Sequence, residues 1–311
     1  MEFTGGMTVL GGMTVTRQPP TYSAYAIFGY GSGPTAITNL VSNTGVVAGD
    51  TTGVGTARYA LAAAGYGTDK AIFGYGRSST DLSITNLVSN TGVVATDTAG
   101  VGTARYVLAA AGYGTDKAIF GYGSQAGAGT DSAITNLVSN TGVVATDTAG
   151  VGTIRQQLAA AGYGTDKAIF GYGYSISLAS SLSTTNLVSN TGVVASNTTG
   201  VGTARQALAA AGYGSSGQAI FGYGNGDRSM TNLVSNTGVV ATDTTGVGTG
   251  RSQLAAAIYG GDKAIFGYGY NSGLGVVSLT NLVSNTGVVA TDTTGVGTAR
   301  TTLAAATYGS T

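Results

Sequence analysis

Carboxylates are the side chains best suited to acid–base chemistry in this sequence, because it contains no histidine and no cysteine. Most of the aspartates recur at equivalent repeat positions, where Asx turns are the favoured explanation. The recurring residues are Asp50, Asp97, Asp147, Asp243 and Asp292 in one series, and Asp69, Asp116, Asp166 and Asp262 in another. Only Asp81, Asp131 and Asp227 depart from the repeat, in loops of different copies, and nothing in the pattern brings two of them together. We therefore expect no catalytic residues and no enzyme activity.

The same absences exclude thiolate and histidine metal sites and the usual pairs of nucleophile and base. A serine–lysine dyad stays open, although all four lysines occupy repeated turn positions. The string GYGNGDRS at 222–229 resembles a glycine-rich phosphate loop, but no helix pattern follows it. The segment 225–227 could contact calcium, yet a polar loop is the simpler interpretation. The sequence thus predicts no cofactor and no metal.

One arginine precedes an apolar segment in each repeat copy, which predicts a ring of six cations. They are Arg58, Arg105, Arg155, Arg205, Arg251 and Arg300. The favoured interpretation is that each pairs with acids or strand-end carbonyls, and the alternative is an anion site at the mouth of a central channel. Ahead of Arg205, Asn197 replaces the expected aspartate, which offers a natural test of the pairing.

Twelve of the eighteen tyrosines occupy repeat positions, exemplified by Tyr75 and Tyr122 in FGYG and by Tyr113 in LAAAGY. We expect these rings to complete the packing between repeats with the hydroxyl reaching water, and stacking on sugars is the alternative. Tyr174 and Tyr270 extend the FGYG block into variable loops, so they are better candidates for ligand contact.

Composition excludes several classes of partner. Charged residues make up 8% of the 311 residues and the formal net charge is zero, so nucleic acid is not expected. The first twenty residues lack a basic stretch followed by an apolar core, and no secretory signal is predicted. No window approaches the length of an apolar membrane span. The 54 glycines recur at fixed positions, which is typical of turns and close strand contacts.

A repeat with spacings of 45 to 51 residues organises the chain. Three blocks occur six times: AIFGYG, TNLVSNTGVVA, and GVGT followed by an arginine and LAAA. The first block begins at Ala26, Ala71, Ala118, Ala168, Ala219 and Ala264. One propeller blade has this period. The sequence therefore predicts an all-β fold, a six-bladed β-propeller of four-stranded antiparallel blades over residues 21–311.

The copy at 105–144 illustrates the expected strands. An alanine-rich inner strand at 106–113 precedes a strand at 117–122, a third around 136–138 and a fourth through 143–144. Six of the seven phenylalanines belong to the second strand of a copy and are expected in the core. The first copy lacks an LAAA strand, whereas the last LAAA has no AIFGYG after it. We expect the carboxy-terminal strand at 303–310 to pair with 26–31 and close the ring.

The order of these features resembles the kelch repeat. In the same copy the resemblance is carried by Arg105, Asp116, Lys117, Gly121, Gly123 and Asn136. The sequence has Gly-Tyr-Gly where kelch repeats have a glycine pair, and it lacks their typical tryptophan. The resemblance implies an interaction platform more often than an oxidase. The glycine- and threonine-rich copies also look like repeats in predicted proteins of marine bacteriophages, which suggests a virion component.

Loops between the second and third strands differ most among the copies. They span 32–37, 77–84, 124–134, 174–184, 225–230 and 270–279. In an antiparallel meander they emerge on one face, which indicates a recognition surface. The candidate contact residues there are Arg77, Asp81, Asp131, Tyr174, Asn225, Asp227, Arg228, Tyr270 and Asn271.

These features together predict a non-enzymatic structural or recognition module, located on a virion or extracellular. Its expected partner is a host surface or another virion protein, and a lectin-like, glycan-binding propeller on a cell surface is the alternative. Residues 1–20 lie outside the repeat and contain GGMTV twice. We expect them to form an arm that lies either on the propeller's own outer blade or on another protein of an assembly.

Overall fold

The computed structural model describes residues 24–125, 127 and 129–309, and the arm expected at 1–20 lies outside them. Within the described residues the fold is all-β, with six antiparallel three-stranded sheets and two short hairpins. Each sheet has an inner, a middle and an outer strand and is called a repeat unit below. Unit 1 contains the first strand of the chain, and units 2 to 6 follow in chain order. The same residues include no helix long and apolar enough to cross a membrane.

The strands of each class have closely related sequences. The inner strands of units 1 to 6 are β22 (Ala304–Tyr308), β3 (Ala62–Tyr66), β6 (Ala109–Tyr113), β11 (Ala159–Tyr163), β16 (Ala209–Tyr213) and β19 (Ala255–Tyr259). The middle strands are β1 (Tyr25–Gly31), β4 (Lys70–Gly74), β7 (Lys117–Gly121), β12 (Lys167–Gly171), β17 (Gln218–Gly224) and β20 (Lys263–Asn271). The outer strands are β2 (Thr35–Val41), β5 (Thr85–Val88), β10 (Thr135–Val138), β15 (Thr185–Val188), β18 (Arg228–Val234) and β21 (Gly275–Val283).

The fourth strand expected in each unit is reduced to isolated bridges. In unit 3 the chain beyond its turn meets β10 at Val138↔Val144 and Thr135↔Thr148. The amide of Asn136 donates to the carbonyl of Ala145 between these two points, so a side chain takes the acceptor that a regular ladder would use. The sheets therefore have three regular strands instead of four.

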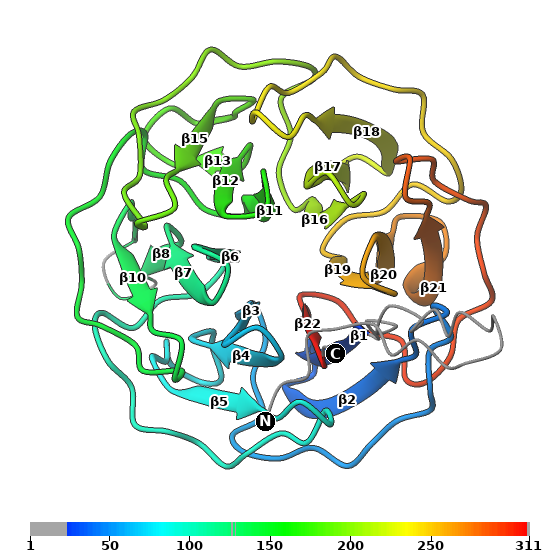
Figure 1. Cartoon of the computed structure of the whole chain (residues 1–311), viewed down its shortest axis with the longest axis horizontal. Helices are drawn as coiled ribbons and strands as arrows, with labels where there is room; N and C mark the ends of the chain where they lie inside the picture. Colours follow the sequence, from blue (N-terminus) through cyan, green and yellow to red (C-terminus); the bar gives the residue numbers. More distant parts are fainter. Residues whose placement is uncertain (1–23, 126, 128, 310–311) are drawn as a thin grey trace, which may run out of the picture.

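The six sheets surround a central axis, with the inner strands facing it (Figure 1). Each inner strand contacts the inner strands of both neighbouring units, and β22 contacts β3 and β19. Small side chains permit this approach: a Cβ added to Gly112 would lie 3.3 Å from the carbonyl oxygen of Gly65 in the preceding unit. The alanine-rich inner strand predicted from the sequence is confirmed.

A closed circle of backbone hydrogen bonds joins the units where the chain approaches the inner strands. Its members are Ala60, Val107, Gln157, Ala207, Gln253 and Thr302, and each donates its N–H to the carbonyl of the preceding unit's member at 2.8–2.9 Å. All six have positive φ angles of 47–57°, which cost non-glycine residues about 1–3 kcal/mol each. The circle fixes this conformation in every unit.

Phenylalanine fills the space between units, as predicted. Phe120 is fully buried, and its ring lies edge-on to Tyr75 of the preceding unit with the centroids 5.1 Å apart. Gly74 makes room for it, because an added Cβ would lie 2.6 Å from the phenylalanine Cζ. The tyrosine differs from expectation: it is fully buried, and its hydroxyl donates to the Val101 carbonyl at 3.1 Å instead of reaching water. Burial raises the pKa of Tyr75 to about 12.

The two ends of the chain share one sheet. As expected, β22 pairs with β1, with Ala305 opposite Phe28 and Tyr308 opposite Tyr25. Further contacts reinforce the closure, because Thr298 donates its N–H to Asp50 at 3.0 Å and Arg300 donates to Asn39. The last part of the chain thus completes the first repeat unit.

Deleting residues 303–311 should destabilise the whole ring. The deletion removes the buried Leu303 and Tyr308 and bares the backbone edge of β1. Burial of large side chains at about 1.5–3 kcal/mol each implies a loss of about 3–6 kcal/mol. Thermal unfolding followed by circular dichroism measures it, and a truncated chain that melts with the intact protein would contradict the closure.

Candidate functional site

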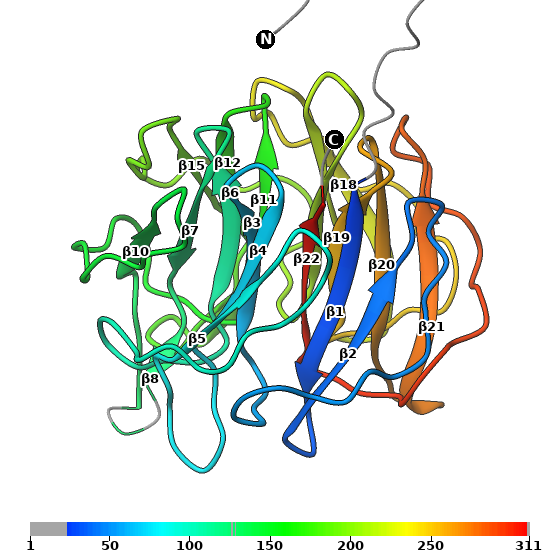
Figure 2. The same ribbon diagram turned by 60° about the horizontal axis from the view of Figure 1, so that its bottom comes forward.

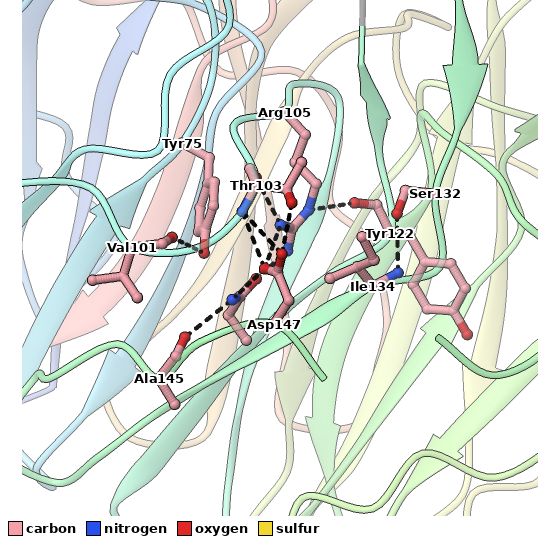
Figure 3. A network of polar contacts seen from close by, with 10 residues as sticks. Tyr75, Val101, Thr103, Arg105, Tyr122, Ser132, Ile134, Ala145 and Asp147 are labelled. Atoms are coloured by element: carbon pink, nitrogen blue, oxygen red, sulfur yellow. Dashed lines mark hydrogen bonds and ion pairs between the residues drawn. The ribbon is translucent and has the colours of Figure 1, made fainter. Parts of the chain in front are cut away.

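A polar network around a buried arginine crosses each unit, and Figure 3 shows the one in unit 3. In unit 3 the guanidinium of Arg105 donates to the carbonyls of Tyr122 at 2.8 Å and Thr103 at 3.1 Å, and to the Asn136 side-chain oxygen at 2.6 Å. The Asn136 amide donates in turn to Asp147 at 2.9 Å. The network thereby links the approach to the inner strand with the middle strand, the outer strand and the segment beyond it.

The same guanidinium also contacts the neighbouring unit. Its central carbon lies 4.5 Å from the ring centroid of Tyr75, which belongs to unit 2. Asp147 lies 4.0 Å from the nearest guanidinium nitrogen and accepts the hydroxyl of Thr103 at 2.6 Å. Each network therefore ties the strands of one unit together and packs against the unit before it.

The arginines do not form a channel-mouth anion site. Arg58, Arg105, Arg155, Arg205, Arg251 and Arg300 are at most 1% exposed. All six donate to an outer-strand asparagine, and four also donate through Nε to a tyrosine carbonyl, while the Nε of Arg155 and Arg300 has no partner. Buried, partnered guanidinium groups cannot reach an ion in the channel, so that alternative is wrong. All six donate to a threonine carbonyl and five lie within 4.0 Å of an aspartate, so the expected pairing holds except that Arg155 has no acid.

The repeated aspartates after the outer strands complete these networks. Burial raises the pKa of Asp147, but hydrogen bonds from Thr103 and Asn136 and the charge of Arg105 outweigh it, and the net shift is downward. Asp50, Asp97, Asp243 and Asp292 show the same balance of causes. Their recurrence is therefore structural, as expected, although the partners lie across the sheet and not within a local turn.

Unit 4 lacks the carboxylate. Asn197 accepts the Thr153 N–H at 3.2 Å and donates to the Thr153 hydroxyl at 2.7 Å, which preserves the geometry without the charge. It serves the network of Arg155, whereas Arg205, which follows it in sequence, pairs with Asp243 of unit 5. Each network closes within its own sheet, so the partners of an arginine lie after it in the chain in units 2 to 6, whereas Arg300 of unit 1 pairs with Asn39 and Asp50 earlier in the chain.

Asn197→Asp should stabilise the protein. The new carboxylate would accept both Thr153 donors and supply the charge that Arg155 lacks, a gain of about 0.5–1 kcal/mol for a partly exposed pair. Asp147→Asn in unit 3 is the matched reverse change, with an equal loss expected. Urea unfolding at neutral pH measures both, and a destabilising Asn197→Asp would contradict the pairing.

Acid should weaken the ring through the five repeated aspartates. Their folded pKa values lie below the ordinary value of 3.8, so their stabilisation is present above that pH and is lost as the pH falls through the folded pKa. We expect melting temperature to be constant from neutral pH to about pH 5 and to fall steeply below pH 4. The Asn197→Asp gain should vanish in the same range, and a gain that persists at pH 2 would have another origin.

The variable loops are largely short β-hairpins. In unit 3 the loop contains β8 (Ser124–Gln125) and β9 (Thr130–Asp131), and in unit 4 it contains β13 (Tyr174–Ser175) and β14 (Ser180–Ser181). In units 1, 5 and 6 it continues the middle and outer strands. Every loop joins a middle to an outer strand, so all six lie at the same end of the ring, the lower end in Figure 2.

The three non-repeated aspartates do not come together. Asp81 pairs with Arg77 at 3.4 Å within unit 2. Asp131 accepts the N–H of Ile176 at 2.7 Å, and Asp227 accepts the N–H of Ser272 at 3.1 Å, so each binds the hairpin of the following unit. The three aspartates therefore make separate contacts within the ring.

Most other candidate residues also make contacts inside the protein. Arg77 lies over the ring of Tyr106, 5.2 Å from its centroid. Asn225 accepts the N–H of Gln206, and Arg228 donates to the Asn225 carbonyl. The side-chain oxygen of Asn271 accepts the N–H groups of Gly273 and Leu274 and so stabilises the turn that it begins. Within the described part of the chain, no group of three or more acidic residues is placed to hold a metal ion.

Sequence reasoning missed a second variable segment beside the hairpins. Two residues between each repeated arginine and leucine differ among units, at 59–60, 106–107, 156–157, 206–207, 252–253 and 301–302. The backbone of this segment forms isolated β-bridges with the hairpins: Tyr59 pairs with Arg77, Gln156 with Tyr174 and Ser252 with Tyr270. The second residue of each pair and the following leucine line an axial hollow of about 80 Å³. Their variation within an otherwise repeated string was the available signal.

Comparison with known protein families and with curated proteins finds no match to this chain.

Proposed function

We propose that the chain is a six-bladed, kelch-like β-propeller that acts as a non-enzymatic recognition module. Its partner is a host-surface protein or another protein of a virion. Support for the architecture comes from the six similar sheets around one axis and from the pairing of β22 with β1. The placement on a virion rests on the resemblance to the bacteriophage repeats.

One observation carries the recognition role: the two segments that vary most among the units lie together at one end of the ring. The hairpins and the residue pairs at 59–60, 106–107 and their equivalents are joined by bridges such as Tyr106↔Ser124. The framework beneath them repeats in all six units, including the buried arginines. A structural requirement would constrain the two segments alike in every unit, whereas recognition of an asymmetric partner requires them to differ.

The composition of this surface suits binding to a protein. The hairpins are rich in serine and also contain glycine, two tyrosines and two asparagines, and Tyr270 is 41% exposed. Binding loops of antibodies have a similar composition, because tyrosine supplies contact area at low entropic cost and small polar residues adapt their hydrogen bonds. The closed backbone circle supports these loops on a rigid base.

A lectin-like, glycan-binding role is the second candidate. Unit 6 favours it, because the exposed Gln253 follows Ser252, which pairs with the exposed Tyr270. An aromatic face beside an amide can stack on a sugar and hydrogen-bond its hydroxyls.

Replacing the long hairpins at 124–134, 174–184 and 270–279 by the six-residue loop of unit 1 should abolish binding and leave folding intact. The hairpins add little to the core between the sheets. The control exchanges the turn at 214–218 of unit 5 for the turn at 114–117 of unit 3, at the opposite end of each unit. Binding to glycan arrays and to proteins of the native source, with melting curves for every variant, provides the measurement.

Retained binding by the uniform-hairpin variant would overturn the recognition role of this face. Loss of binding in the control alone would move recognition to the opposite end. A glycan-array signal that depends on the hairpins would favour the lectin.

A further inference from the structure

Two of the six variable hairpins expose large apolar side chains. Ile176 and Leu178 in unit 4 are 42% and 58% exposed, and Leu274 and Val276 in unit 6 are 63% and 44% exposed. No large apolar residue of the other four hairpins is exposed to this degree among the described residues. The apolar hairpins flank unit 5, whose own variable loop at 225–230 is shorter than either of them.

Each apolar hairpin is held by an aspartate from the preceding unit. Asp131 of unit 3 accepts the N–H of Ile176, and Asp227 of unit 5 accepts the N–H and the hydroxyl of Ser272. Both contacts join residues 45 positions apart in the chain, close to one repeat length. The two aspartates thus fix two apolar tips by the same device.

The gain in stability from this device is small at Asp131. The residue is 7% exposed, and its second carboxylate oxygen has no hydrogen-bond partner. A buried polar atom without a partner is unfavourable, and this offsets part of the stability that the bond to Ile176 contributes. The net contribution of Asp131 to stability is therefore small, and its hold on Ile176 gives the residue a role in positioning.

Electrostatics define the partner that fits. The apolar hairpins at 174–184 and 270–279 contain no charged residue. The loop of unit 5 between them has one charge of each sign, and both are engaged within the protein, since Asp227 binds Ser272 and Arg228 donates to the Asn225 carbonyl. A charged partner surface would lose its hydration here without gaining an opposite charge, whereas an uncharged apolar surface matches the hairpins.

We propose, on the basis of the recognition role above, that the hairpins of units 4 and 6 form a two-point contact surface for an uncharged apolar segment of a protein. Asp131 and Asp227 are its positioning residues. They hold the tips in place before the partner arrives, which reduces the entropy lost on binding. The segment lies across the shorter loop of unit 5, between the two hairpins.

Hydrogen exchange in the isolated protein tests the positioning residues. Asp131→Ala should speed exchange of the Ile176 amide by roughly tenfold or more, and Asp227→Ala should do so for Ser272, because each amide loses a charged acceptor. Asp81→Ala, in the hairpin of unit 2, is the matched control and should leave both amides unchanged. The melting temperature of Asp131→Ala should stay close to that of the parent protein, because the lost hydrogen bond and the relieved unpaired oxygen oppose each other. Unchanged exchange, or a large drop in melting temperature for Asp131→Ala, would refute the positioning role.

Selection from a library of random displayed peptides tests the surface. Peptides recovered on the parent protein should be uncharged and apolar, and they should bind the Leu178→Ser, Leu274→Ser double variant at least tenfold more weakly. Val46→Ser, an exposed position in a turn outside the hairpins, is the control and should leave binding unchanged. Recovery of charged peptides, of none, or of peptides indifferent to the double variant would overturn this surface. Peptides that need other hairpins would overturn it while leaving the proposed recognition role in place.

Discussion

Each unit of this ring buries one guanidinium, and a guanidinium removed from water must find acceptors for its donors. The outer-strand asparagine and the carbonyl of the preceding threonine provide them, joined in four units by the carbonyl of the FGYG tyrosine. The same asparagine donates to the aspartate or asparagine beyond the outer strand. These groups come from four separate segments, so satisfying one charge determines how far apart the segments lie. The tyrosine of the preceding unit covers the remaining face of the guanidinium. Strand pairing alone would join the strands of a sheet, but the arginine also sets where one sheet meets the next.

The position of the arginine determines the geometry near the axis. Two residues after it, the chain adopts a positive φ and enters the circle of backbone hydrogen bonds, where valine and glutamine occupy a conformation usually left to glycine. Because the circle uses only backbone atoms, its side chains are free to differ from unit to unit. The hairpins begin just beyond the tyrosine whose carbonyl the arginine binds in most units. Both variable segments therefore start from points that the buried charge has already fixed.

Features that repeat in every unit could be predicted from the sequence, whereas contacts between residues far apart in the chain could not. The LAAA block and one phenylalanine recur in each unit, and they revealed the inner strand, the core between sheets and the terminal closure. Burial of Arg105 was not evident, because its acceptors lie 17 and 31 residues away and no local pattern joins them. Asn197 was assigned to the wrong arginine for the same reason. The prediction of a regular fourth strand was wrong because the side-chain amide of Asn136 binds the carbonyl of Ala145. Strand propensities do not include such a competing side chain. The contacts of Asp131 and Asp227 occur once each, so no repeat could reveal them.

Dividing the chain into a repeated framework and a variable end has an energetic consequence. A change in the framework alters a buried charge or a packed aromatic ring, and its cost reaches two units at once. A change in a hairpin alters exposed residues whose replacement usually shifts stability by about 0.5 kcal/mol or less, and added loop length costs little entropy. Hairpins can therefore acquire different lengths and contacts, as in units 3 and 5, without disturbing the strands below. The framework does not connect neighbouring hairpins. Asp131 and Asp227 make such connections, because each binds the hairpin of the following unit.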